Sequence, residues 1–110
     1  MTQWEIYDYS FPDPIGPHPA IIFSPTEVAD NPDILFVNVL MVVSLRAARP
    51  VRKFEVALNG ADGLDNLSVV KVLPIYLVAK SDLGRRRGFV IRVRQQSISG
   101  KIREAYRLMS

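Results

Sequence analysis

The longest apolar stretch of the chain reads Ile34-Leu35-Phe36-Val37-Asn38-Val39-Leu40-Met41-Val42-Val43, with Asn38 as its one polar residue. Apolar and β-branched side chains occupy both sets of alternating positions, which is typical of a strand covered on both faces. The stretch is about half as long as a membrane-spanning helix, which needs roughly 20 residues. It therefore predicts the central strand of a buried sheet.

Weaker strand signals lie on both sides of this stretch. Before it, residues 20–24 form a short apolar run that ends at Pro25. After it, Lys53–Leu58 alternates between apolar and charged side chains, and the later β-branched run contains Pro74, which marks a bulge or an edge. The strands that we expect cover residues 4–9, 20–24, 34–43, 53–58, 67–76 and 89–94.

Two connections are rich in turn-forming residues. Phe11–Pro19 holds four prolines and Gly16, and we expect a fixed, exposed loop, because proline donates no hydrogen bond to a ladder. Asn59–Asn66 contains an Asn-Gly and an Asp-Gly pair, which indicate a hairpin connection. A single helical turn is expected to begin at Thr26.

The end of the chain has a helical period instead. Apolar residues recur there at spacings of three and four, which is the stripe of an amphipathic helix. Ser97 or Ser99 is expected to cap the first turn. The apolar residues of the stripe are Ile98, Ile102, Ala105, Tyr106 and Met109.

These elements predict one mainly β domain over residues 1–110. A chain of 110 residues has the length of a single domain and is too short for two ordinary cores. Five or six strands followed by one helix predict a small, strongly bent sheet or barrel with the helix packed on it. Residues 1–5 lack the basic start and the apolar run of a signal peptide, so we expect a cytoplasmic protein without a membrane partner.

The composition excludes several chemistries. The chain has no cysteine, which rules out disulfides, thiolate zinc sites and a cysteine nucleophile. His18 is the only histidine, so neither a multi-histidine metal cluster nor a mechanism with two imidazoles is available. Neither a phosphate-binding glycine loop nor a nucleophile-elbow motif is present. We therefore expect no metal and no cofactor.

Positive and negative charge are divided along the chain. All 14 lysines and arginines lie between Arg46 and Arg107, whereas residues 1–45 contain six acids and no base. The first segment sums to −6 and the second, with 14 bases and 5 acids, to +9, which gives the net charge of +3. This asymmetry indicates either a polyanionic or acidic partner for the basic segment, or two segments that pack together and neutralise each other.

His18 and two groups of basic residues are the candidate functional groups. His18 stands between two prolines, where an imidazole is either a general acid or base near neutral pH or a solvent-facing bystander. The basic groups either converge on a cationic groove for phosphates or are solvated turns. They consist of Arg46, Arg49, Arg52 and Lys53, and of Arg85, Arg86 and Arg87.

Five segments of the chain occur in the order and spacing of a known family. They are Trp4-Glu5-Ile6-Tyr7, Gly16-Pro17-His18-Pro19-Ala20-Ile21-Ile22-Phe23-Ser24, Lys53-Phe54-Glu55-Val56, Leu67-Ser68-Val69-Val70-Lys71-Val72 followed by Ile75-Tyr76, and Ile98 to Leu108. This series resembles the MazF/PemK family of toxin–antitoxin endoribonucleases. The resemblance covers nearly the whole chain.

The resemblance implies an SH3-like barrel of the CcdB/MazF type, with five to seven strands and a C-terminal helix, usually as a homodimer. It implies a toxin that cuts single-stranded RNA without a metal, and a cognate antitoxin whose acidic, disordered tail lies along the RNA groove. RNA and antitoxin would compete for the basic groups defined above. In the implied reaction a base takes the 2′-hydroxyl proton, an acid protonates the leaving 5′ oxygen, and cations stabilise the phosphate.

Three places depart from the pattern of the family. His18 stands where the family usually has arginine directly before the proline of the second strand. Leu40 and Met41 stand at the expected end of the central strand, where threonine or serine is common. Lys71 keeps the basic residue of the fifth strand, but Leu73 replaces the aspartate that many members have two residues later.

Two interpretations of these departures remain open. In the first, His18 and Lys71, helped by a loop arginine, form a rearranged catalytic site for RNA cleavage. In the second, the fold persists without cleavage as an RNA-, antitoxin- or other protein-binding module, for example a CcdB-like non-nuclease toxin.

Overall fold

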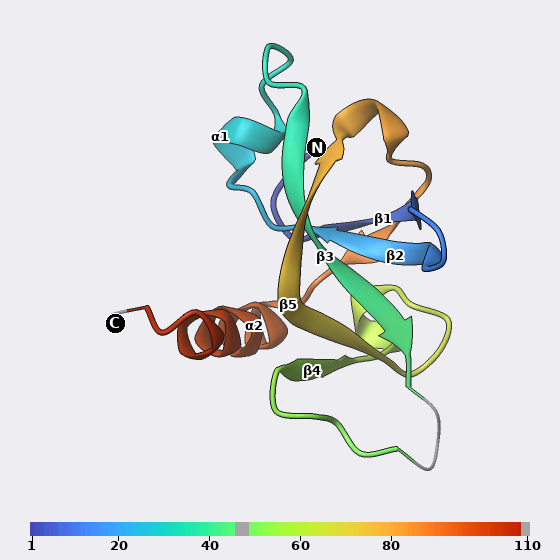
Figure 1. Cartoon of the computed structure of the whole chain (residues 1–110), viewed down its shortest axis with the longest axis vertical. Coiled ribbons are helices and arrows are strands. Elements are labelled where there is room, and N and C mark those ends of the chain that lie inside the picture. Colours follow the sequence, from blue (N-terminus) through green and yellow to red (C-terminus); the bar gives the residue numbers. More distant parts are fainter. Residues whose placement is uncertain (46–48, 109–110) are drawn as a thin grey trace.

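Six antiparallel strands form one curled sheet with a helix packed against it, in a computed structural model that describes residues 1–45 and 49–108 (Figure 1). The predicted mainly β fold with a C-terminal helix is confirmed. The strands are β1 (Glu5–Phe11), β2 (Gly16–Ile22), β3 (Phe36–Ser44), β4 (Glu55–Leu58), β5 (Ser68–Ala79) and β6 (Arg86–Phe89). The helices are α1 (Thr26–Ala29) and α2 (Arg92–Ala105), with short 3₁₀ turns at Gly60–Asp62 and Lys80–Asp82.

β3 is the central strand that its sequence predicts. The strand order is β4-β5-β3-β2-β1-β6, so β3 pairs with β2 on one side and with β5 on the other. Leu40 and Val42 belong to a core that also contains residues of α2, whereas Val39 and Met41 belong to a second core that contains Ala29 of α1. Burial on both faces explains why apolar side chains occupy both alternating sets.

The proline-rich segment corrects the expected loop. β2 already begins at Gly16, and Gly16–Pro19 pairs with Asp8–Phe11 of β1. Pairing of β2 with β3 starts at Ala20, so the earlier part of β2 has a strand partner on one side alone. Such an edge tolerates proline, because a missing N–H on the open side leaves no ladder bond unmade. The expectation of a loop over Phe11–Pro19 is therefore wrong for its second half.

β5 carries the predicted irregularity at Pro74. Val39 of β3 pairs with Tyr76, and Met41 pairs with Lys71, so residues 72–75 of β5 lie opposite Leu40 alone. Extra residues in one strand bend it and increase its twist, which suits a sheet that curls. The prediction of a bulge or an edge at Pro74 is confirmed.

The last strand and the helix have boundaries that the sequence did not indicate. β6 ends at Phe89 and α2 begins at Arg92, so the expected strand over residues 89–94 is wrong. Ile98 and Ile102 are buried, as the apolar stripe predicts, while Met109 lies outside the described residues. No helix in the described ranges is long and apolar enough to cross a membrane.

The start of α2 is set by a carboxylate from another element rather than by a serine. Ile91 is the N-cap residue, so the expectation of a cap at Ser97 or Ser99 is wrong. The Ile91 amide donates a hydrogen bond of 3.0 Å to the Asp62 carboxylate, which lies at the end of the 3₁₀ turn after β4. The Ser97 hydroxyl donates to the Val93 carbonyl inside the helix instead.

The turn after β4 also contacts β6, and two glycines make this contact possible. A Cβ atom on Gly88 would lie 2.2 Å from the Asp62 carbonyl oxygen, and one on Gly63 would lie 2.8 Å from the Arg87 carbonyl oxygen. Gly63 has a φ of +89°, which side chains rarely adopt. β4 and β6 are the outer strands of the sheet, so this contact connects its two edges.

Substituting Gly88 tests this contact. We expect Gly88→Ala to lower the free energy of unfolding by about 1–3 kcal/mol, because backbone atoms must move to admit the methyl group. Gly100→Ala is the matched control, because Gly100 lies within α2 and a Cβ there meets nothing within 4 Å. That change should raise the free energy of unfolding by about 0.5–1 kcal/mol. Urea titrations measure both, and equal effects of the two substitutions would contradict the proposed close contact.

Candidate nucleic-acid interface

Two adjoining clefts, with volumes of about 490 and 290 Å³, lie around His18. Both are lined by Pro17–Pro19 and by Arg87, so these residues stand where the clefts meet. We call the two clefts together the His18 groove. Its other polar lining residues are Asp8, Ser10, Ser44, Asp65, Asn66, Ser68, Asp82 and the phenol-bearing Tyr9.

His18 is presented by strand pairing and by aromatic packing. It lies on β2 opposite Tyr9 of β1, and its ring centroid is 6.3 Å from that of Phe11. Phe11 is buried and also packs edge-on against Tyr76. A paired strand beside a buried ring restricts the position of the imidazole.

Arg87 is the fixed cation of the groove. Its guanidinium donates to the Asp8 carboxylate at 2.9 Å and to the Asp65 carboxylate at 3.0 Å. The hydrogen bond to Asp8, with the charges of both carboxylates, outweighs burial and raises the pKa of Arg87 above its ordinary value. This arginine is therefore always charged and held between two acids.

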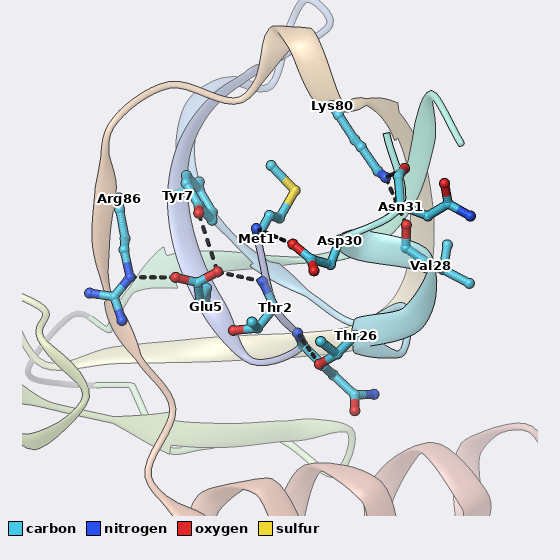
Figure 2. A network of polar contacts seen from close by, with 11 residues as sticks. Met1, Thr2, Glu5, Tyr7, Thr26, Val28, Asp30, Asn31, Lys80 and Arg86 are labelled. Carbon is cyan, nitrogen blue, oxygen red and sulfur yellow. Dashed lines mark hydrogen bonds and ion pairs between the residues drawn. The ribbon is translucent and has the colours of Figure 1, made fainter. Parts of the chain in front are cut away.

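The other two arginines of this group are also paired with acids of the first segment. Arg86 donates to Glu5 at 2.6 Å, and the Arg85 guanidinium lies 3.8 Å from Asp8. Figure 2 shows Glu5 receiving hydrogen bonds from Thr2, Tyr7 and Arg86 together. Burial raises the pKa of Glu5, but these hydrogen bonds outweigh it and leave that pKa below its ordinary value. At Arg85–Arg87 the acidic and basic segments thus neutralise each other in part.

Lys80 belongs to the same part of the fold but has a structural role. Its ammonium group donates to the carbonyl oxygens of Val28 and Asn31, each at 2.7 Å (Figure 2). These carbonyls lie at the end of α1, where backbone acceptors have no partner within the helix. Lys80 therefore ties α1 to the end of β5.

Arg49 and Arg52 of the first basic group contact Glu55 at the other end of the sheet. Arg49 donates to both Glu55 oxygens, at 2.8 and 3.1 Å, and the Arg52 amide donates to one of them. The Lys71 ammonium lies 4.0 Å from the same carboxylate. Burial raises the pKa of Glu55, but the hydrogen bonds from Arg49 and Arg52 and the charges of Arg49 and Lys71 outweigh it, so the pKa is lowered.

Lys71 and His18 lie on one face of the sheet but line different clefts. Ala20, Met41 and Lys71 are successive cross-strand partners, and His18 lies two residues before Ala20, so all four point to the same face. Lys71 lines a separate hollow of about 260 Å³ with Arg52, Lys53, Phe54, Glu55 and Leu73. The structure therefore does not bring the two candidate catalytic residues into one cleft. Arg46 lies outside the described residues.

Ser44 is a groove residue that the sequence reasoning missed. β3 runs to Ser44, whereas Leu40 and Met41 are buried within the strand, so placing the strand end at Leu40 and Met41 is wrong. Ser44 lines the groove with His18 and Arg87. The signal that could have identified it is that the apolar run Ile34–Val43 ends directly before a hydroxyl residue.

Comparison with known proteins gives this groove a family context. The family model of the PemK-like, MazF-like toxins of type II toxin–antitoxin systems matches residues 2–106. The chain belongs to this family. No curated protein is similar enough to the chain in sequence to count as a relative.

Solved structures of MazF-type toxins have the same fold as this PemK/MazF-like toxin. An endoribonuclease in complex with its cognate antitoxin, from Mycobacterial species, superposes with a TM-score of 0.82 at 19% identity, covering 100% of this chain and 98% of the other. The Mycobacterium tuberculosis toxin MazF-mt6 gives 0.80 at 21%, covering 96% and 99%. A MazE–MazF structure from Deinococcus radiodurans gives 0.73 at 17%, covering 99% and 97%.

The strand end changes how this toxin departs from its family pattern. The central strand ends at a hydroxyl residue, Ser44, which lines the smaller of the two clefts with His18. Leu73 remains a departure, because it lies in the bulge of β5 and is partly exposed beside Lys71. Among residues 1–45 and 49–108, no three acids, histidines or cysteines are grouped to hold a metal ion.

The lowered pKa of Glu55 predicts a pH-dependent contribution to stability. Because the folded pKa lies below the ordinary value of 4.5, the contribution is present above pH 4.5 and is lost as the pH falls through the folded pKa. Glu55→Gln should therefore destabilise the toxin at pH 7, and its difference from wild type should shrink on acidification. Urea titrations at pH 7 and pH 3.5 measure this.

Glu27→Gln is the control for that measurement, since Glu27 is exposed on α1. It should change the free energy of unfolding by less than about 0.5 kcal/mol at either pH. A Glu55→Gln effect of the same size at both pH values would show that ionisation of Glu55 does not stabilise the fold.

Proposed function

We propose that this toxin cuts single-stranded RNA in the His18 groove without a metal ion. The observation that carries the proposal is that His18 and Arg87 both line the two adjoining clefts, and that Ser44 lines the smaller one. The groove therefore contains a group that can transfer protons, a permanent cation and a hydroxyl that can donate a hydrogen bond. Membership of a toxin family with MazF-like members supports RNA as the substrate.

The proposed reaction is an attack of the RNA 2′ oxygen on the adjacent phosphorus. A 2′,3′-cyclic phosphate forms, the bond from phosphorus to the 5′ oxygen breaks, and the proton lost by the 2′-hydroxyl is balanced by one gained at the leaving oxygen. His18 is the group that transfers protons, Arg87 stabilises the charge on the phosphate, and Ser44 donates a hydrogen bond to a phosphate oxygen. No step in this scheme uses a metal ion.

In this proposal Lys71 binds a phosphate and does not transfer protons. It lies on the same sheet face as His18 but in the hollow next to Arg52, beside Glu55. A lysine there can bind a phosphate of the RNA some distance from the bond that breaks. Together with Arg49 and Arg52 it would extend the RNA path along the face towards β4.

A cognate antitoxin is the second proposed partner. The solved structures of similar fold include an endoribonuclease in complex with its cognate antitoxin and a MazE–MazF structure. The cations that would hold RNA phosphates would equally hold the carboxylates of an acidic antitoxin tail. We therefore propose that the antitoxin inhibits by occupying the His18 groove and the hollow around Lys71.

A homodimer is proposed through the exposed apolar part of the β3–β5 face. Phe36 and Leu77 are 52% and 67% exposed, and they lie on one face because Leu77 pairs with Asn38. Leu35, which precedes Phe36, is exposed as well. A second copy of the chain would cover this surface, because contiguous apolar patches of this kind mark protein contacts.

Substitution of His18 tests the nuclease proposal. We expect His18→Ala to lower kcat for cleavage of single-stranded RNA in the presence of EDTA by roughly 10²–10⁴-fold, as loss of a general acid or base does. Lys71→Ala should instead raise KM with a smaller effect on kcat. The products should carry 2′,3′-cyclic phosphate and 5′-hydroxyl ends, which mass spectrometry distinguishes.

Lys101→Ala on α2 is the control and should leave cleavage unchanged, since Lys101 lines neither the His18 groove nor the hollow around Lys71. Cleavage at the wild-type rate by His18→Ala would remove His18 from the mechanism. Growth arrest on induced expression without any RNA ends of this type would favour a toxin that acts by binding alone.

The dimer proposal has its own measurement. Leu77→Asp should convert a dimer to a monomer in sedimentation experiments, because a charge would be buried in an apolar contact. Asp33→Ala, at an exposed acid, should leave the oligomeric state unchanged. A wild-type chain that sediments as a monomer at 100 µM would exclude this dimer.

A further inference from the structure

Two arginines of α2 have no carboxylate partner in the described part of the chain. The arginines of β6 and of the segment before it are paired with Glu5, Asp8 and Asp65. Arg94 of α2 is paired with Asp62. Within residues 1–45 and 49–108, no carboxylate lies within 4.0 Å of the guanidinium groups of Arg92 and Arg103, and neither residue belongs to the groups proposed above.

These two arginines stand at opposite ends of a polar cleft of about 520 Å³, which we call the α2 groove. The cleft lies between α2 and the start of the chain, and it shares no lining residue with the His18 groove. Its α2 side is a single helical stripe with spacings of three, one, three and four residues. The lining residues are Gln3, Trp4, Arg92, Gln95, Gln96, Ser99 and Arg103, with no acid among them.

The placement of Arg92 opposes the ordinary electrostatics of a helix. Arg92 is the first residue of α2 and no acid lies in the first turn, so the Asp62 carboxylate that accepts the Ile91 amide is the acid at that end, and it is already bonded to Arg94. The free amides and the peptide dipoles make a helix start positive, so a cation there is unfavourable by a few tenths of a kcal/mol. Features that oppose local stability in this way are expected where a site serves binding.

Two glutamines of the groove are oriented by the fold. The Gln3 side-chain nitrogen donates to the Phe23 carbonyl at 2.8 Å, and the Gln95 nitrogen donates to the Val90 carbonyl at 2.8 Å. Each amide group therefore has its nitrogen engaged with the protein, which leaves its oxygen available as an acceptor for a ligand. Trp4 beside them is held by an edge-on contact with Phe23, with ring centroids 5.8 Å apart.

We propose that the α2 groove binds single-stranded RNA as a second contact surface, apart from the His18 groove. Arg92 and Arg103 are eleven residues apart, which is about 16 Å along a helix, so they can hold phosphates several nucleotides apart. The amide oxygens accept from exocyclic amino groups of bases, and Trp4 offers a stacking surface. An acidic peptide fits less well, because its carboxylates would face those amide oxygens. The inference rests on RNA being the substrate of the proposed function.

Binding of an RNA that cannot be cut tests this inference independently of cleavage. The probe is a fluorescent 12-nucleotide 2′-O-methyl RNA of mixed sequence, titrated with the full chain and followed by anisotropy at several salt concentrations. The double variant Arg92→Gln/Arg103→Gln should weaken binding at least about 10-fold. The slope of log K against log salt should fall by about 1.4, because two phosphate contacts are lost on a single strand.

Lys101→Gln/Arg107→Gln is the matched control, because it removes the same charge from the α2 region outside the groove. It should weaken binding by less than about twofold. Equal losses in the two double variants would show a general charge effect and would overturn the proposal, as would wild-type affinity in the Arg92→Gln/Arg103→Gln variant. Thermal melts confirm that each variant folds.

Two further results separate this inference from the proposed function. If wild-type protein does not cut ordinary RNA but the groove variant still loses affinity for the probe, the second surface stands and the nuclease proposal fails. If a ten-residue glutamate peptide binds the wild type, loses affinity in the groove variant, and the RNA probe does not bind, the α2 groove is a peptide site and this inference fails.

Discussion

The hydrogen bonds to the buried carboxylate of Asp62 are the interactions on which the arrangement of the molecule depends. Asp62 is 1% exposed and receives hydrogen bonds from the Asn59 and Ile91 amides and from the Arg94 guanidinium, all between 3.0 and 3.1 Å. These donors come from the turn after β4 and from the start of α2. One buried acid therefore joins the sheet edge at β4 to the helix that follows β6, which keeps the curled sheet closed.

Closure at Asp62 positions the His18 groove as well as the core. Arg87 lies on β6 directly before Gly88, which contacts the turn at Asp62 and Gly63, and its second partner Asp65 lies just beyond that turn. Its first partner, Asp8, comes from β1. The charge division in the sequence thus serves partly to build the groove wall, whereas Arg92 and Arg103 of α2 have no carboxylate partner among residues 1–45 and 49–108. Neutralisation between the two segments is thus observed at Arg85–Arg87, whereas a polyanionic partner for other basic residues stays a prediction.

Local patterns in the sequence predicted those elements whose cause is local. Apolar residues in both sets of alternating positions identify β3, Pro74 identifies the bulge, and the apolar stripe from Ile98 identifies most of α2. The start of β2 and the start of α2 depend on distant partners, because β1 accepts a proline-containing edge and Asp62 fixes Ile91. His18 was a candidate from its chemistry alone. That it lines one cleft with Arg87 and Ser44 results from the curl of the sheet, and no short segment of the sequence predicts this.

The two-acid clamp on Arg87 has a thermodynamic consequence for any anion that binds there. A free arginine side chain has about 2 kcal/mol of rotamer entropy, most of which a ligand must remove before a well-oriented contact forms. Arg87 has already lost that freedom on folding, because Asp8 and Asp65 hold its guanidinium. A phosphate would therefore meet an ordered donor and lose little additional entropy at this residue. The phosphate must, however, share the Arg87 guanidinium with the carboxylates of Asp8 and Asp65. Recognition of the phosphate there therefore depends more on the orientation of the guanidinium than on additional electrostatic attraction.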